Sequence, residues 1–320
     1  MKTGKFVGLC ILVFIVFFVI GIMSKGIKGS WAKKYSVEWS DEIGTLYSDI
    51  SYGDKEANKF DLYLPKDNTK KNYGMVVYLH AGGFTTGDKV DDKKTLAWLC
   101  SKGYVAVGIN YTLRTDQNEA SVLTQSNEIK EAIPKVIEEA KKYGYNINGI
   151  TMSGGSAGGT LAMLYAYRDA EESPVPVKLL FEMVGPSSFH VEDWGIYGLD
   201  QDTDESIKAA AGLFSVMAGV ELTPEMIKDG SYQELMTPIS AYKFVNENSV
   251  PSLLLYGTED KFQPYKGVRH LEKALKDNNV DYKLFVAPHS GHGVQNDDKI
   301  MKAYMEAVDE YLEKYMPVEK

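Results

Sequence analysis

A serine stands between glycines two residues away on either side, in the segment Gly154-Gly155-Ser156-Ala157-Gly158. An apolar, strand-like run leads into this segment, and a helix-like run over residues 160–165 leaves it. That order is typical of a nucleophile elbow, in which a sharp turn presents a serine hydroxyl for attack. The glycines permit strained backbone and close approach of neighbouring chain. Because a glycine-rich turn of any α/β protein has the same pattern, the partners of Ser156 must come from the rest of the chain.

A serine hydroxyl is a weak nucleophile at neutral pH, so it needs an adjacent base. The chain has five histidines: His80, His190, His270, His289 and His292. Only the last two follow the final expected strand, and His292 lies between two glycines in a loop able to reach the elbow. We expect His292 to be the base and His289 to lie at the rim of the site. We expect His270, which has charged neighbours on a helix, to be solvated, and His190 to edge the cap described below.

A carboxylate that fixes the tautomer of the base and steadies its charge completes such a site. The apolar run over residues 252–256 predicts a buried strand, and the turn after it contains Glu259 and Asp260. This turn precedes the histidine loop, so the groups follow one another in the order serine, acid, histidine. We expect Asp260 to be the orienting acid, with Glu259 as the alternative.

A tetrahedral acyl intermediate carries an oxyanion, which requires preorganised backbone donors. The N–H of Ala157, directly after the serine, is one expected donor. The pair Gly82 and Gly83 follows another apolar run, and we expect it to supply further donors while His80 supports that loop by hydrogen bonds. The histidines and acids lack zinc-ligand spacing, and no Gly-Lys-Ser/Thr follows a glycine run. The sequence therefore predicts an oxyanion hole and neither a metal nor a cofactor.

Apolar strands and amphipathic helices alternate along most of the chain. We expect strands over residues 58–64, 75–79, 104–109, 177–184, 252–256 and 282–286 and before the elbow, and helices over residues 92–102, 118–143 and 297–315. Continuous apolar runs are typical of strands buried on both faces, so the pattern predicts an α/β fold with a mainly parallel sheet flanked by helices. Binding groups gather at the carboxyl ends of such strands. His80, Ser156, Asp260 and His292 all directly follow an expected strand.

Three stretches carry particular expectations. Residues 187–250 interrupt the alternation, and we expect them to form a helical cap insertion whose aromatic and methionine side chains pack mostly within the cap itself. The helix over residues 118–143 contains Pro134, where we expect it to bend or begin. Residues 58–64 alternate polar and apolar side chains, as a half-buried strand does.

The first part of the chain differs from the rest in composition. Residues 6–23 are almost unbroken Val, Ile, Leu and Phe with lysines on both sides, and such a run can cross a hydrocarbon core as a helix. We expect an N-terminal signal anchor or transmembrane segment in residues 1–28, a tether in residues 29–45, and a hydrolase domain in residues 46–320 that lies outside the cytoplasm. The alternative is secretion after cleavage near residues 30–32.

The remaining composition is that of a globular protein, with 44% hydrophobic and 25% charged residues. The formal net charge of −9 at pH 7 would be repelled by nucleic acid, so nucleic-acid binding is not expected. The two cysteines, Cys10 and Cys100, do not suggest a disulfide framework.

Four motifs together resemble the α/β-hydrolase superfamily, and within it the esterase and lipase group of hormone-sensitive-lipase-like carboxylesterases and bacterial acetyl or feruloyl esterase-like enzymes. They are His80-Ala81-Gly82-Gly83-Phe84, Gly154 to Gly159 with Leu161-Ala162, Gly257-Thr258-Glu259-Asp260 with Pro264, and Gly291-His292-Gly293. The resemblance covers residues 46–315 and implies an α/β-hydrolase fold with the triad Ser156, Asp260 and His292 in that superfamily's chain order. Gly155 stands where the hormone-sensitive-lipase-like branch usually has Asp, which favours the bacterial branch.

The sequence thus predicts a serine hydrolase that cleaves carboxylic esters through an acyl-enzyme on Ser156. We expect short or aromatic acyl groups, with an acylated glycan as one candidate substrate. A peptidase or amidase of the same fold is the first alternative, and a non-catalytic surface-binding module is the second.

Overall fold

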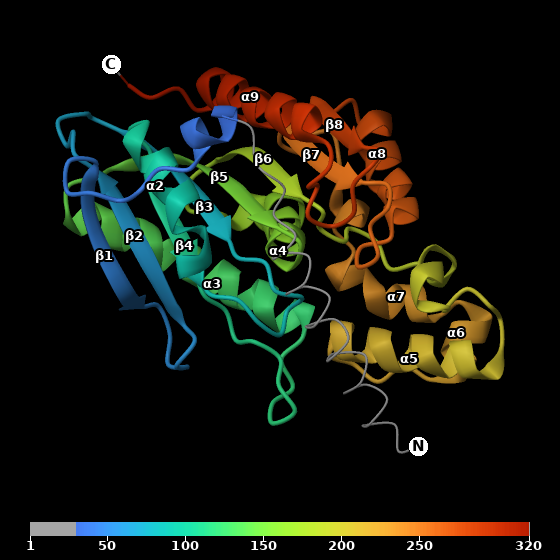
Figure 1. Cartoon of the computed structure of the whole chain (residues 1–320). Coiled ribbons are helices and arrows are strands. Elements are labelled where there is room, and N and C mark those ends of the chain that lie inside the picture. The colour runs from blue at the N-terminus through green and yellow to red at the C-terminus, as the bar shows by residue number, and fades with distance from the viewer. Residues whose placement is uncertain (1–29, 320) are drawn as a thin grey trace.

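The computed structural model describes residues 30–319, which form one eight-stranded sheet with helices on both faces (Figure 1). The strands are β1 (Gly44–Ser51), β2 (Lys59–Pro65), β3 (Tyr73–Leu79), β4 (Val105–Ile109), β5 (Ile147–Gly155), β6 (Val177–Met183), β7 (Ser252–Gly257) and β8 (Tyr282–Ala287). Their order across the sheet is β1-β2-β4-β3-β5-β6-β7-β8. Only the pairs β1/β2 and β2/β4 are antiparallel. The expected mainly parallel sheet is therefore confirmed.

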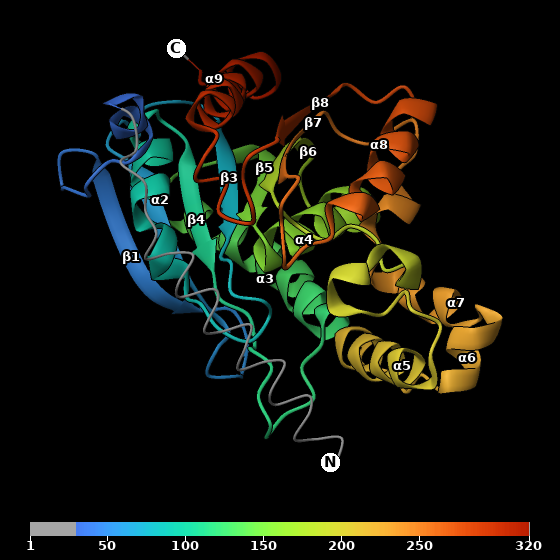
Figure 2. The ribbon, with the colours of Figure 1, turned by 45° about the vertical axis from the view of Figure 1, so that its right-hand side comes forward.

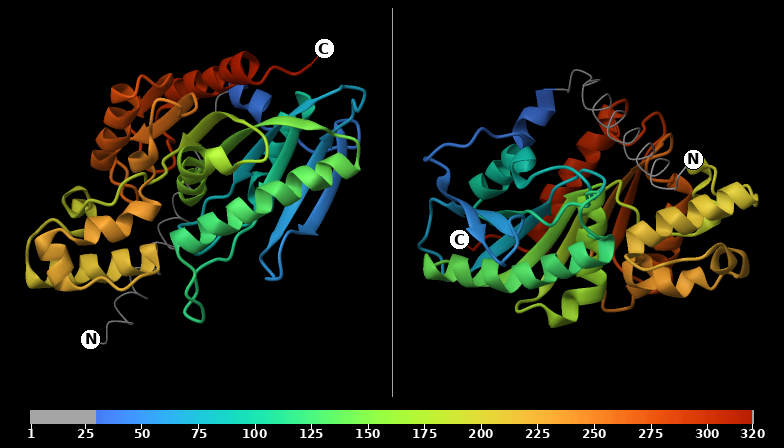
Figure 3. Two further views of the ribbon diagram at one scale, coloured as in Figure 1. Left: turned by 180° about the vertical axis from the view of Figure 1, so that it is seen from behind. Right: turned by 90° about the horizontal axis from the view of Figure 1, so that it is seen from below.

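Two layers of helices cover the sheet. The α-helices are α2 (Lys93–Ser101), α3 (Val122–Lys142), α4 (Ala157–Leu164), α5 (Asp204–Ala218), α6 (Pro224–Asp229), α7 (Tyr232–Met236), α8 (Val268–Asp277) and α9 (Asp298–Tyr315). Side chains of α2 and α9 pack on one face, whereas those of α3, α4 and α8 pack on the other, where α3 runs across the sheet (Figure 3). Helices α5, α6 and α7 gather at one end of the molecule, away from β1 (Figure 2).

The central strand β3 has one fixed register in the sheet, because both of its faces are buried. Every residue of β3 is buried. Met75 and Val77 pack with the layer that contains α3 and α4, whereas Val76 and Tyr78 pack with the layer that contains α2 and α9. Because alternate side chains enter two separate cores, a shift of one residue along the strand would exchange both sets of contacts. The position at which the following loop leaves β3 is therefore fixed.

Two elements differ from their expected form. Helix α3 begins at Val122, after Ser121 caps it by accepting the N–H of Thr124, and continues through Pro134 to Lys142. Pro134 is exposed, so water can pair with the carbonyl that the proline leaves without its helical donor. Strand β2 is buried at six of its seven positions, not half-buried, because α2 covers one face and α3 the other.

The segment before β1 is packed against the domain, unlike a free tether. Residues Ser30–Tyr35 form a 3-10 helix. The indole N–H of Trp31 donates to the Asp298 carboxylate at 2.8 Å, and Lys34 pairs with Asp309 on the same helix α9 at 2.6 Å. The expected anchor over residues 6–23 lies outside the described residues. Within residues 30–319, no helix combines the length and apolar character that a membrane span requires.

Candidate active site

The serine expected as nucleophile occupies a strained turn between β5 and α4. Ser156 has φ 53° and ψ −119°, a conformation that costs free energy and persists only where the surroundings impose it. A Cβ atom on Gly154 would lie 2.7 Å from the Leu79 carbonyl oxygen, and one on Gly158 would lie 2.0 Å from the same atom. Only glycine fits at these two positions, because the elbow packs directly on the end of β3.

Ser156, His292 and Asp260 are brought together from the ends of three strands. The Nε2 atom of His292 lies 2.8 Å from Ser156 Oγ, and its Nδ1 atom lies 2.7 Å from Asp260 Oδ2. With a proton on Nδ1 that is donated to the carboxylate, Nε2 is free to accept the hydroxyl proton. Asp260 is 4% exposed, and its second oxygen accepts the backbone N–H groups of Phe262 and Gln263. The arrangement can therefore activate the serine hydroxyl.

The loop that carries His292 is held by a residue that sequence reasoning missed. The Asp297 carboxylate accepts the hydroxyl of Ser290 at 2.6 Å and the backbone N–H of His289 at 2.9 Å. The ring of Phe262 lies edge-on to His292, with 5.3 Å between the centroids. His289 itself is exposed, as expected for a rim residue. An acidic residue four to eight positions after a loop serine or histidine is too common a pattern to have identified Asp297.

The loop after β3 places backbone beside the nucleophile. Gly83 lines the cavity next to Ser156, with φ 59°. Gly82, with φ 132°, forms the turn itself, since its carbonyl accepts the N–H groups of Thr85 and Thr86. Ala157 is the first residue of α4, so its N–H has no carbonyl partner within the helix. The three residues expected at the oxyanion hole thus lie at the elbow and in the adjoining loop.

His80 is buried beneath that loop. Its Nδ1–H donates to the Ala81 carbonyl at 2.7 Å, and its ring stacks on Tyr111 at 4.3 Å. The Tyr111 hydroxyl in turn donates to the His80 carbonyl at 2.9 Å. Burial lowers the pKa of His80 below its usual value, so the ring is neutral at pH 7. The side chain does not reach Ser156 and contacts the loop, in keeping with the supporting position expected for it.

A cavity of about 230 Å³ opens beside Ser156 and His292 between the sheet end and the cap. The cap helix α5 contributes Leu213 and Met217, and the segment before it contributes Trp194. Phe214 and Met236 are fully buried within the cap, as expected for its own core. Trp194 and Met217 therefore serve the cavity as well as the cap, which the sequence alone did not indicate.

The remaining histidines, His190 and His270, lie where the cap meets α8. His270 on α8 is not solvated, because its Nε2 atom lies 2.8 Å from the buried carboxylate of Asp193. His190 stacks on His270 at 4.3 Å and shares a hydrogen bond with Tyr242. Both rings connect the cap to α8 and neither lines the cavity.

Behind the elbow lies a buried acid that the sequence also did not reveal. Glu182 in β6 pairs with Gly154 of β5 and has no exposed surface. Its carboxyl accepts the N–H of Gly185 at 2.9 Å. Burial raises the pKa of Glu182 to about 8, so the group is largely protonated at neutral pH.

Within residues 30–319, no cluster of His, Cys, Asp and Glu is suited to hold a metal ion.

The sheet order, the strained elbow and the Ser-His-Asp arrangement define an α/β-hydrolase. A model of the BD-FAE family matches residues 60–275, and the chain belongs to the BD-FAE family. A truncated carbohydrate esterase from gut microbiota superposes with a TM-score of 0.66 at 17% identity, covering 87% of this chain and 99% of that one. Esterase B from Lactobacillus rhamnosis gives 0.64 at 19% identity, over 94% of each chain. These likenesses confirm the fold.

Curated relatives carry names of two kinds. Ethyl acetate hydrolase of Pseudomonas putida is 25% identical over 83% of this chain and 79% of its own length, and esterase LipC of Mycobacterium tuberculosis is 25% identical over 76% and 59%. Acylamino-acid-releasing enzyme of Rattus norvegicus is 24% identical over 84% of this chain, which spans only 34% of that enzyme. The assignment to the esterase and lipase group of the α/β-hydrolases is thereby confirmed.

Proposed function

We propose that this protein is a serine esterase that hydrolyses carboxylic esters through an acyl-enzyme on Ser156. One observation carries the proposal: His292 bridges the Ser156 hydroxyl and the Asp260 carboxylate at 2.8 and 2.7 Å, at the wall of a cavity. The esterase names of relatives that match most of this chain support the same conclusion.

In the proposed reaction, Ser156 Oγ attacks the ester carbonyl carbon while its proton passes to Nε2 of His292. The oxyanion receives the N–H groups of Ala157 and of the Gly82-Gly83 loop. Collapse of this intermediate expels the alcohol, which takes the proton from His292. Water then attacks the acyl-enzyme with His292 again as the base, and the acid leaves. Asp260 keeps the imidazole oriented and stabilises its positive charge in both halves.

Short or aromatic acyl groups are the proposed acyl part. The cavity of about 230 Å³ beside Ser156 is lined mainly by apolar side chains, which suit such groups. Acylated glycans are a further candidate, since a carbohydrate esterase is among the structural neighbours.

The test is hydrolysis of p-nitrophenyl esters from acetate to decanoate, combined with labelling by a fluorophosphonate. Burst release of p-nitrophenol and labelling that disappears in Ser156→Ala are expected. Undiminished hydrolysis by Ser156→Ala would refute the mechanism.

Amide hydrolysis is the second candidate, favoured by the acylamino-acid-releasing enzymes among the relatives. An N-acetylated amino acid p-nitroanilide beside the matching ester separates the two activities. A kcat/KM for the anilide equal to that for the ester would favour the amidase.

We also propose that residues 6–23 hold the protein at a membrane with the hydrolase domain outside the cytoplasm, because their unbroken apolar composition suits a spanning helix. Extraction of cell membranes with alkaline carbonate tests this. Retention in the pellet is expected, whereas release of a shortened chain into the medium would indicate a cleaved signal peptide.

A further inference from the structure

A cation with an unused hydrogen-bonding edge lines the cavity. Arg114 lies in the segment between β4 and α3, and its side chain is half-buried. Its Nη1 atom donates to the Ala120 carbonyl at 3.1 Å. Among residues 30–319, neither an acidic partner nor a further acceptor is found for its Nε–H and Nη2–H groups. Those two groups form the edge that binds a carboxylate in a bidentate manner.

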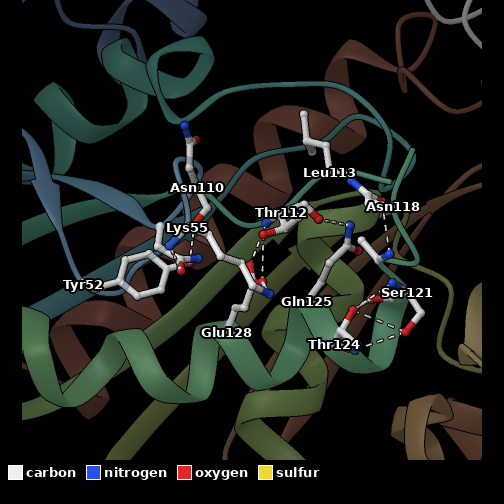
Figure 4. Close-up of polar contacts among 12 residues, drawn as sticks. Tyr52, Lys55, Asn110, Thr112, Leu113, Asn118, Ser121, Thr124, Gln125 and Glu128 are labelled. Carbon is white, nitrogen blue, oxygen red and sulfur yellow. Dashed lines mark hydrogen bonds and ion pairs between the residues drawn. The ribbon is translucent and has the colours of Figure 1, made fainter. Parts of the chain in front are cut away.

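The segment that carries Arg114 is fixed on both sides (Figure 4). Thr112 donates through its backbone N–H and its hydroxyl to the buried Glu128 carboxylate, at 2.6 and 2.8 Å. Asn118 donates to the Leu113 carbonyl at 2.9 Å. Gln125 donates to the Thr112 carbonyl at 2.8 Å. Glu128 and Gln125 both project from α3, so this helix holds the Arg114 segment in place.

The same segment is joined to the loop beside the nucleophile. The Phe84 carbonyl, next to Gly83, accepts the backbone N–H of Arg114 and the side-chain amide of Gln125, both at 2.9 Å. The backbone of Arg114 is therefore held at a set position relative to Ser156 before any substrate binds. Preorganisation of this kind is typical of groups that orient a ligand.

Two further positive features face the same cavity. Lys208 on α5 lines it and, within the described chain, has no hydrogen-bond or ion-pair partner. Ser121 and Val122 also line it, so the N-terminal end of the 21-residue helix α3 directs its dipole toward the cavity. No Asp or Glu belongs to the described cavity lining, although the chain has a net charge of −9. The local charge is thus opposite to that of the whole protein.

We propose that the preferred substrates are esters that carry a free carboxylate, which Arg114 binds while Lys208 and the start of α3 add positive potential. The inference rests on the proposed esterase function and names the substrate class of that site. Most of the other lining residues are apolar, so the carboxylate would sit at one end of a largely apolar ester. The carboxylate can belong to the acyl part or to the alcohol part.

Two matched pairs of esters test the proposal and distinguish these sources. Monomethyl adipate against dimethyl adipate places the charge on the acyl side, and 4-acetoxybenzoate against its methyl ester places it on the alcohol side. For each pair, the ratio of kcat/KM for the anionic ester to that for the neutral ester is measured in the wild type, Arg114→Gln and Lys208→Gln. The control is Lys135→Gln, which removes an exposed charge elsewhere on α3.

In at least one pair, the ratio is expected to fall about 10-fold or more in Arg114→Gln, as loss of a charge-assisted pair would cause, and about threefold in Lys208→Gln. It should stay within about twofold in Lys135→Gln, because Lys135 is exposed and does not line the cavity, so salt screens its charge. An unchanged ratio in both pairs, with neutral esters still hydrolysed, overturns this inference and leaves the esterase function intact. If the wild type hydrolyses p-nitrophenyl esters but none of these four esters, this inference alone is overturned. Failure with all of these esters overturns both.

If Arg114→Gln does not fold, Lys208→Gln and the salt dependence of the wild type decide. Added NaCl is expected to lower kcat/KM for the anionic ester and to leave that for its neutral partner unchanged. An equal response of both esters to salt, together with an unchanged ratio in Lys208→Gln, overturns the inference.

Discussion

The parallel strands and the cap helices both reach the cavity, but they hold their side chains in different ways. Ser156 and Asp260 follow the buried strands β5 and β7, whereas His292 follows the edge strand β8. At the elbow, Gly154 and Gly158 leave no room for a Cβ atom. The cap contributes Leu213 and Met217 from helix α5, where both are only partly buried. The strand ends determine the geometry of reaction, whereas the cap determines the space for substrate. Changes in the two regions should therefore have different effects.

Removal of the nucleophile should have the largest effect on the strand side. Ser156→Ala deletes the attacking oxygen, and kcat for p-nitrophenyl acetate should fall by about 10⁴-fold or more. Ser153→Ala is the matched control, because Ser153 lies on the same strand and its buried hydroxyl has no hydrogen-bond partner among the described residues. Steady-state kinetics with folded protein of each variant gives the two kcat values. Comparable loss in both variants would contradict the role assigned to Ser156.

The two histidines of the last loop should differ by a wide margin. His292→Ala removes the base, so kcat should fall by about 10³- to 10⁴-fold, whereas His289→Ala should change it by less than about threefold. His289 is exposed, and only its backbone is bound, to Asp297. If His289→Ala lost activity and His292→Ala kept it, the assignment of His292 as the base would be wrong.

Alanine at the two glycines before the serine tests the tight packing of the elbow. Gly154→Ala places a Cβ atom 2.5 Å from Gly158 backbone, and we expect it to lower the free energy of unfolding by about 2–4 kcal/mol. Gly155→Ala meets no atom within 4 Å and should change it by less than about 1 kcal/mol. Urea unfolding followed by circular dichroism measures both. Equal free energies of unfolding for the two variants would show that the elbow has room for an added methyl group, contrary to the tight packing inferred for the strand ends.

On the cap side, a larger side chain should alter selectivity more than chemistry. Leu213→Trp narrows the cavity, and the ratio of kcat/KM for p-nitrophenyl hexanoate to that for acetate should fall about 10-fold. Leu235→Trp is the control, because Leu235 is 38% exposed on α7 and does not line the cavity. An equal loss for both esters in Leu213→Trp would mean that the cap also positions the reacting groups.

The smallest effect concerns Glu182 behind the elbow. Its folded-state pKa of about 8 exceeds the ordinary 4.5, so the folded protein binds a proton that the unfolded chain has lost. Stability should therefore fall as the pH rises through this window, by about 1 kcal/mol between pH 7 and pH 8 from this group. Glu182→Gln should lack that share of the decline, as urea unfolding at the two pH values would show. The same decline in both proteins would assign it to other groups.

Much of the fold could be predicted because the relevant patterns are local. Unbroken apolar runs identified β3, β4 and β7 as buried strands, and their alternation with helices predicted the parallel order. A helix start at Pro134 was wrong, because α3 already begins at Val122 and continues through this exposed proline. The 3-10 helix at residues 30–35 was missed, since its stability comes from contacts with α9, far away in the chain.

The sequence by itself determined which side chains could react, since a serine between glycines and a histidine and an acid after strands are features of short segments. Only the tertiary structure decided how those groups are surrounded. Glu182 has a raised pKa because strands and helices distant in sequence exclude water from it. Arg114 and Lys208 meet at one cavity because α5 folds back beside the start of α3. Burial and electric potential are sums over neighbours in space, so residue order alone does not contain them.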